Sequence, residues 1–185
     1  MSEKKNLTPV EKIKSKSANL RGSIEEGLEI QTTGSLSDED TQLTKFHGFY
    51  QQDHRDIRDE RRHQKLEPLY SFMLRARVPG GVINYEQWEA IDKISRELTS
   101  GGIRLTTRQT FQYHGILKRN VKSLIKGIND AFIDSLAACG DVNRNVLCNS
   151  NPMESILHER VYKDAISVSN HLLPKSRAYH EIWLD

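Results

Sequence analysis

The 185-residue chain has little cysteine, and its two cysteines lie outside any recognisable metal motif. Cys139 and Cys148 form neither a CxxC pair nor a cluster with histidine, so thiolates of this chain cannot assemble a metal site. Two cysteines could form one disulfide, but reduced thiols are the usual state in a cytosolic protein. We therefore expect two free thiols and no metal ligands.

Long apolar runs are also absent. The N-terminal segment is polar and charged, without the apolar stretch of a signal peptide or a membrane span. Hydrophobic residues make up 36% of the chain, and the net charge is only +2, which does not suggest a protein that coats nucleic acid. We expect a cytoplasmic protein with one domain of ordinary size, or one and a half small domains.

Acidic residues are missing from one long segment. No Asp or Glu occurs between Glu97 and Asp130, and the cations in this window are Arg104, Arg108, Lys118, Arg119, Lys122 and Lys126. Cations without nearby counter-ions repel one another, so the segment could serve an anion. A solvated surface explains the same composition, and the pattern alone favours that simpler interpretation.

The first third of the chain does not predict a packed structure. We interpret residues 1–45 as a polar arm, either disordered or ordered by another chain. Residues 46–69 begin with aromatic residues and continue as a dense mixed-charge run. This segment is either a solvated helix or loop, or residues 49–51 form an ordered loop over a ligand.

Between residues 70 and 134 the sequence predicts the order β-α-β-β-α. The predicted strands are 70–78, 103–106 and 110–116, and the predicted helices begin after the N-caps Asn84 and Asn120. Gln87 stands where a capping box requires it. This order is the front of a ferredoxin-like α+β half-domain, which we place at residues 70–138, with its helices on one face of the sheet.

Alternation along the strands divides the predicted sheet into two faces. The helix-covered face receives Phe72, Leu74, Ala76, Ile103, Leu105, Phe111 and Tyr113. The other face receives Arg75, Arg77, Arg104, Arg108, Gln112 and His114. Because cations from three strands gather there without a carboxylate, the predicted sheet favours an anion site on this face.

Residues 139–185 predict a loop-rich segment followed by helix. Asparagines surround Arg144, which could reach the same pocket from a strand edge. A helix is predicted at 155–173, with an inward stripe of Leu157, Val161, Ala165, Val168 and Leu172. The aromatic run after Arg177 looks cut off at Asp185.

Four motifs occur in order: FHGFYQQDHRDIR, LRARVPGG, IRLTTRQTFQYHGI and NRNVLCNSNP. With these motifs the chain resembles the N-terminal part of the haemoprotein (beta) subunits of assimilatory NADPH-dependent sulfite reductases, in the nitrite/sulfite reductase family. Members of that family are much longer, so the resemblance implies a fragment. Residues 139–185 would then begin a sirohaem-binding α+β domain.

The resemblance implies the six-electron reduction of sulfite to sulfide, in sulfate assimilation and cysteine biosynthesis. It implies sirohaem bridged to a 4Fe-4S cluster, and a hetero-oligomer in which a flavoprotein (alpha) subunit with FAD and FMN delivers electrons from NADPH. The polar arm could dock that subunit. By motif match Arg75 and Arg144 would hold sulfite, whereas Arg104, Thr106, Arg108, Gln112 and His114 would contact sirohaem.

The family's active-site lysines and cluster-ligating cysteines have no counterpart here, so we expect the fragment alone to be inactive. Two alternatives remain open: a ferredoxin-dependent sulfite or nitrite reductase fragment, and a non-catalytic RNA-binding module. An RNA-recognition sheet exposes aromatic side chains on its open face, whereas Phe111 and Tyr113 are expected on the helix side. We expect neither a nucleic-acid nor a membrane partner.

Overall fold

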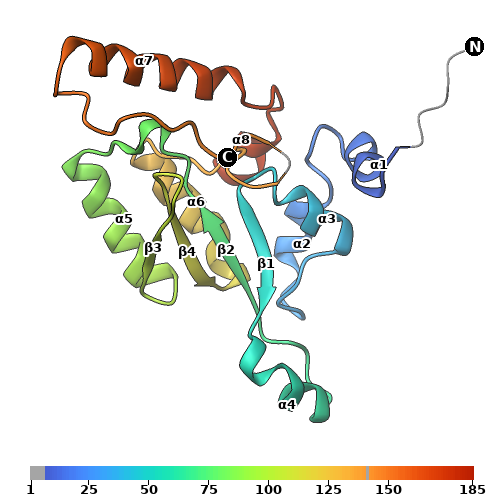
Figure 1. Ribbon diagram of the computed structural model, residues 1–185. Helices are drawn as coiled ribbons and strands as arrows, with labels where there is room; N and C mark the ends of the chain where they lie inside the picture. The colour runs from blue at the N-terminus through green and yellow to red at the C-terminus, as the bar shows by residue number, and fades with distance from the viewer. Residues whose placement is uncertain (1–6, 141) are drawn as a thin grey trace, which may run out of the picture.

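The structure, a computed structural model, describes residues 7–140 and 142–185 (Figure 1). Its centre is a four-stranded antiparallel sheet in the order β1-β2-β4-β3. The strands are β1 (Phe49–Asp53), β2 (Tyr70–Arg75), β3 (Ile103–Leu105) and β4 (Phe111–Ile116). The helices are α1 (Pro9–Lys16), α2 (Ile24–Glu29), α3 (Asp38–Leu43), α4 (Arg58–His63), α5 (Tyr85–Leu98), α6 (Val121–Asp130), α7 (Ile156–His171) and α8 (Ala178–Trp183). Short 3-10 turns are η1 (Arg55–Ile57), η2 (Pro79–Gly81) and η3 (Lys118–Asn120).

The order β2-α5-β3-β4-α6 confirms the predicted β-α-β-β-α arrangement and the α+β class. Helices α5 and α6 pack against each other and share one core with the inward side chains of β2 and β4. Tyr113 on β4 is buried, and its hydroxyl donates a hydrogen bond to the Ile91 carbonyl oxygen of α5 at 3.4 Å. The neighbouring residues of β4, Gln112 and His114, therefore lie on the opposite face.

Strand β1 was not predicted, and residues 49–51 are not a loop over a ligand. They pair with β2, in the register Tyr50↔Met73 and Gln51↔Phe72. Phe49 is fully buried, with its ring centroid 5.8 Å from that of Phe72 and 5.3 Å from that of Trp183. Only the charged part that follows, η1 and the exposed helix α4, matches the solvated-helix interpretation.

The interpretation of residues 1–45 as an arm that is disordered or ordered by another chain is wrong for residues 7–45. Ile24, Leu36 and Leu43 are buried in the common core. Lys118, in the η3 turn that follows β4, binds this segment, because its ammonium group donates to the carbonyl oxygens of Gly27 and Ser35 at 3.0 Å each. The sequence did not reveal this order because each apolar residue is isolated among polar ones. Docking of a flavoprotein there stays a prediction.

Three other expectations about helices and strands need correction. Asn120 makes no capping hydrogen bond, and its amide donates instead to the Leu98 carbonyl oxygen at 3.2 Å. The apolar spacing after Asn120 predicts a helical stripe that ends with Ile128 and Phe132, but Phe132 lies beyond the end of α6 with φ +58° and is 94% exposed. Leu105 is 75% exposed, because β3 is a three-residue edge strand that ends there.

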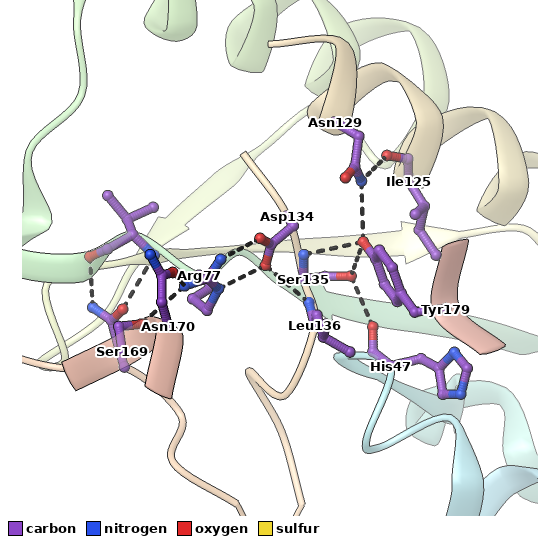
Figure 2. A network of polar contacts seen from close by, with 12 residues as sticks. His47, Arg77, Ile125, Asn129, Asp134, Ser135, Leu136, Ser169, Asn170 and Tyr179 are labelled. Atoms are coloured by element: carbon purple, nitrogen blue, oxygen red, sulfur yellow. Dashed lines mark hydrogen bonds and ion pairs between the residues drawn. The ribbon is translucent and has the colours of Figure 1, made fainter. Parts of the chain in front are cut away.

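Helix α7 does not bury its predicted stripe. Of those five residues only Ala165 is buried, whereas Leu157 is 70% exposed and Leu172 is 48% exposed. The helix contacts η2 instead, and its polar residues bind Arg77 (Figure 2). One guanidinium nitrogen of Arg77 donates to the Ser169 hydroxyl at 3.0 Å and to the Asn170 amide oxygen at 3.1 Å.

The final helix, α8, packs against α6 and against residues next to β1. Tyr179 and Trp183 are buried, and the Tyr179 hydroxyl accepts hydrogen bonds from the Asn129 amide at 3.1 Å and the Ser135 backbone N–H at 3.2 Å (Figure 2). Ser135 in turn donates from its hydroxyl to the His47 carbonyl oxygen at 2.7 Å. The boundary set from sequence at residues 138/139 stays a prediction.

The capping box of α5 provides a first test. The Gln87 backbone N–H donates to the Asn84 side-chain oxygen at 2.8 Å, and the Asn84 N–H donates to the Gln87 side-chain oxygen at 3.0 Å. Asn84→Ala is expected to lower the free energy of unfolding by about 1 kcal/mol, measured by urea denaturation, because the Gln87 backbone N–H at the helix end loses its acceptor. Asn84→Asp keeps the acceptor and should stay near wild type. Equal stability of both variants would contradict this role.

Candidate functional site

Three side chains form a row across the sheet on the face opposite α5 and α6. Gln112 on β4 pairs in register with Arg75 on β2 and with Arg104 on β3. Cross-strand partners project from the same face, so the two guanidinium groups flank the Gln112 amide. His114 lies two residues further along β4 on the same face. The sheet thus confirms the grouping of these four residues.

Gln112 connects the row through hydrogen bonds. It is only 9% exposed, so its amide relies on protein partners. In the orientation that satisfies both neighbours, its oxygen accepts from Arg75 Nε at 3.1 Å and Nη2 at 2.6 Å, and its nitrogen donates to His114 Nε2 at 3.2 Å. Arg75 also donates from Nη1 to the Ala138 carbonyl oxygen at 3.4 Å. Its guanidinium is therefore held from two sides.

Thr106 and Arg108 lie on the turn between β3 and β4. The Thr106 hydroxyl accepts from the Arg108 backbone N–H at 3.3 Å, and the Thr106 N–H donates to the Thr110 carbonyl oxygen at 2.9 Å. Arg104 and Arg108 are exposed, whereas Thr106 is half-buried. The turn therefore presents Arg108 to solvent beside the end of the row.

Two residues that we did not predict attach the segment around Arg144 to this turn. Asn145 is buried and donates from its amide nitrogen to the carbonyl oxygens of Val78 and Arg108, both at 2.8 Å. Gln109 donates to the Cys148 carbonyl oxygen at 2.7 Å and accepts from the Cys148 N–H at 3.2 Å. The sequence offered no signal for either role, since an asparagine in a turn has the same local pattern.

The charges of Arg75 and Arg144 both influence the buried thiol of Cys139. Burial raises the pKa of Cys139 to about 11, and the charges of Arg75 and Arg144 partly oppose that increase. The Cys139 thiol donates to the Gly48 carbonyl oxygen at 3.4 Å. Both cysteines are free thiols, as expected. The charges of Arg75 and Arg144 therefore act on the same buried thiol.

Within the part of the chain that the structure describes, the cations of the site have no anionic partners. Among residues 7–140 and 142–185, no carboxylate forms an ion pair with Arg75, Arg104, Arg108 or Arg144. Burial and the nearby charge of Arg104 lower the pKa of His114 below its ordinary value, so the imidazole is neutral at neutral pH. The arrangement is suited to a ligand with several negative charges.

Arg77 does not belong to this site, although alternation assigned it to the same face as Arg75. Its guanidinium forms an ion pair with Asp134, with Nε 2.8 Å and Nη2 2.5 Å from the two carboxylate oxygens (Figure 2). Strand β2 ends at Arg75, so the alternation no longer applies at Arg77.

Across the described ranges, no group of three or more His, Cys, Asp or Glu residues could hold a metal ion. None of the described helices has the length and apolar character for a membrane crossing.

Comparisons with known proteins agree with this geometry. Residues 63–131 match the nitrite/sulfite reductase ferredoxin-like half domain. The chain is 66% identical to the sulfite reductase [NADPH] hemoprotein beta-component of Shewanella denitrificans and 65% identical to that of Shewanella frigidimarina. Both alignments cover 100% of this chain but 33% of the relative, so the chain spans about a third of their length.

A solved structure supports the same relationship. The NirA protein of Mycobacterium tuberculosis superposes with a TM-score of 0.61 at 26% sequence identity, over 76% of this chain and 27% of that one. The whole-chain identity to the hemoprotein beta-components and the matching half-domain, with its row of arginines, lead to one conclusion. The chain belongs to the nitrite/sulfite reductase family and corresponds to about a third of a sulfite reductase hemoprotein beta-component.

Proposed function

We propose that this chain forms one wall of the sirohaem and sulfite site of an NADPH-dependent assimilatory sulfite reductase. The observation that carries the proposal is the Arg75–Gln112–Arg104 row, whose arginines form no ion pair with a described carboxylate. The segment that contains Arg144 is attached beside it through Asn145 and the Arg108 carbonyl oxygen. The family relationship suggests sirohaem and sulfite as ligands, and the row provides positive charge for these anions. The whole enzyme would reduce sulfite to sulfide with six electrons.

The unpaired cations fit sirohaem, whose rim carries several carboxylates. Arg104 and Arg108 are exposed and can form bidentate hydrogen bonds with such groups. Thr106, Gln112 and His114 would add neutral polar contacts from the turn and from β4. When bound, sirohaem supplies the iron at which sulfite is reduced.

The residues of this chain do not fit an iron–sulfur cluster. Cys139 is buried, burial raises the pKa of its thiol to about 11, and Cys148 lies apart in the next segment. Thiolates are the cluster ligands that proteins use, and a single protonated thiol is unsuited to that role. Cluster ligands would come from the remainder of a longer protein, and the chain alone is expected to be inactive.

Arg75 and Arg144 would bind the sulfite anion. The charges of both guanidinium groups act on Cys139, and Arg75 is fixed by Gln112 and Ala138 before any ligand arrives. Cations that are already in position stabilise negative charge as it develops during reduction, without a cost for reorientation. These two residues would therefore act on substrate, whereas Arg104 and Arg108 would hold the cofactor.

Electrons would come from NADPH through a flavoprotein (alpha) subunit in a cytoplasmic hetero-oligomer. The name "beta-component" of the relatives implies a second component, which favours this assignment. The similarity to NirA supports a second candidate, a sulfite or nitrite reductase that takes electrons from ferredoxin. Turnover of the full-length protein with NADPH plus flavoprotein, compared with reduced ferredoxin, separates the two.

Arg104→Ala, introduced into the full-length protein, tests the cofactor assignment. Loss of one charge-assisted hydrogen bond should weaken retention of sirohaem about tenfold. The control is Arg119→Ala, which removes an exposed cation from η3 within the same acid-free window. Sirohaem absorbance per protein after dialysis is the measurement. Equal retention in both variants would remove Arg104 from the cofactor site.

A further inference from the structure

A chain of hydrogen bonds runs along the arginine row and ends at His114. We propose that His114 is a positioning residue: its unprotonated Nε2 fixes the Gln112 amide so that the amide oxygen faces Arg75 and holds the guanidinium. The inference about orientation stands on this chain alone. Its consequence for sulfite binding rests on the proposed function.

The chemistry of the three groups allows only one arrangement. A guanidinium has donors and no acceptor, so the Gln112 oxygen must face Arg75, whose Nη2 is 2.6 Å away. The Gln112 amide nitrogen then faces His114 Nε2 at 3.2 Å, and that nitrogen must accept. His114 is therefore neutral, with its proton on Nδ1, which has no hydrogen-bond partner among the described residues. That N–H remains available to a ligand.

A proton on Nε2 would break the arrangement. The amide would then lie between two sets of donors, and satisfying His114 would turn the amide nitrogen toward Arg75. Water cannot easily replace the lost bond, because Gln112 is only 9% exposed. The unprotonated Nε2 of His114 therefore keeps the Gln112 amide oxygen directed at Arg75.

The surroundings of His114 maintain this state. Arg104 on β3 faces it and opposes a second positive charge, as does burial of the ring. Arg75 on β2 lies beyond Gln112 in the same row. On β4 itself the neighbour on this face is Gln112, and the described strands provide no carboxylate ion pair for His114. All charged groups here therefore favour the neutral imidazole.

Two-bond 1H–15N spectra of the chain with labelled histidine test the orientation. At pH 7.5 His114, assigned from its loss in His114→Asn, should show the Nδ1–H tautomer. His47 is an internal control with the opposite tautomer, because its Nε2 lies 2.7 Å from the Leu20 carbonyl oxygen and its Nδ1 accepts from Trp183. An Nε2–H tautomer at His114 would overturn the proposal.

A substitution separates positioning from a general structural role. Gln112→Glu places carboxylate oxygens toward both Arg75 and His114, so the Nε2 of His114 should become protonated and its pKa should rise by at least about one unit. An unchanged tautomer and titration would show that Gln112 does not link the two residues. Gln112→Leu, which removes both bonds, should leave His114 as a mixture of tautomers.

The consequence for binding is measured in the full-length enzyme with sirohaem content matched. His114→Gln can place an oxygen acceptor near the Nε2 position, so its increase in the KM for sulfite should be several-fold smaller than that of the donor-only His114→Lys, which should be about tenfold. If the spectra show the expected tautomer but KM does not respond, the orientation stands and the assignment of Arg75 to sulfite fails. If the tautomer is wrong, the positioning role itself fails.

Discussion

Gly48→Ala is expected to lower the free energy of unfolding by more than about 4 kcal/mol, the largest loss we predict for one residue. Gly48 has φ +92°, and a β-carbon there would lie 1.9 Å from the Ser135 backbone oxygen and 2.7 Å from its carbonyl carbon. Backbone atoms cannot rotate away as a flexible side chain could. The contact must therefore separate β1 from the segment that contains Ser135.

Nearby hydrogen bonds prevent an easy adjustment. The Gly48 carbonyl oxygen accepts from the Arg75 backbone N–H at 3.0 Å and from the Cys139 thiol at 3.4 Å. The neighbouring His47 carbonyl oxygen accepts from the Ser135 hydroxyl at 2.7 Å. Moving Gly48 breaks contacts with Arg75 on β2 and with the segment of Ser135 and Cys139, so stability and the position of Arg75 are both affected.

Gly101→Ala is the matched control. Gly101 has nearly the same backbone angle, φ +89°, but a β-carbon there meets no atom within 4 Å. Its cost should be the backbone strain alone, about 1–2 kcal/mol. Urea denaturation of both variants separates strain from steric contact. Equal losses would show that the Ser135 contact relaxes without cost; failure of Gly48→Ala alone to give a cooperative transition would agree with the prediction.

Acid is expected to destabilise the protein through His47 by about 3 kcal/mol between pH 6.5 and 4, the second large effect. The ring is 1% exposed, and burial lowers its pKa to about 4. Its Nδ1 accepts from the Trp183 indole N–H at 2.8 Å. A proton on Nδ1 would break that bond and place a charge in the core.

The direction in which stability changes with pH follows from the pKa values of His47 in the unfolded and the folded protein. In the unfolded chain His47 takes up a proton near pH 6.5, whereas in the folded protein it does so only near pH 4. Stability from this group is complete above pH 6.5 and declines as the pH falls toward 4, by up to about 1.4 kcal/mol per pH unit. Below that range the contribution of His47 no longer changes.

Urea denaturation at pH 7.5, 5.5 and 4.5, followed by tryptophan fluorescence, measures the effect. His47→Gln is the control, because glutamine does not titrate and its stability should depend less on pH. The comparison is necessary because His114 also has a lowered pKa. Parallel pH dependence in wild type and variant would contradict the role of His47.

Local patterns in the sequence predicted the half-domain. The capping box of α5 joins residues three apart, and alternation along β4 separates Tyr113 from Gln112 and His114, so a short window contains the needed information. The same logic grouped Arg75 with Arg104 before their strands were known to be linked through β4. The four motifs added the family, which the comparisons confirmed.

Contacts between residues far apart in the sequence determined which of the predicted site residues come together. Arg75 and Arg77 are equivalent in pattern, yet Arg77 pairs with Asp134, 57 residues away, and leaves the site. Asn145 has the composition of a turn, but it is buried and its amide attaches the segment around Arg144 to Val78 and to the β3–β4 turn. Spacing along the chain cannot encode such partners.

The sequence by itself thus determined the order of β2, α5, β3, β4 and α6 and the chemical character of both sheet faces. Hydrogen bonds and apolar periodicity over two to four residues specify those features. Only the tertiary structure decided that β1 completes the sheet, that residues 7–45 are packed, and which arginines stay unpaired. Those outcomes depend on which distant surfaces meet, because a side chain is buried or neutralised by its neighbours in space.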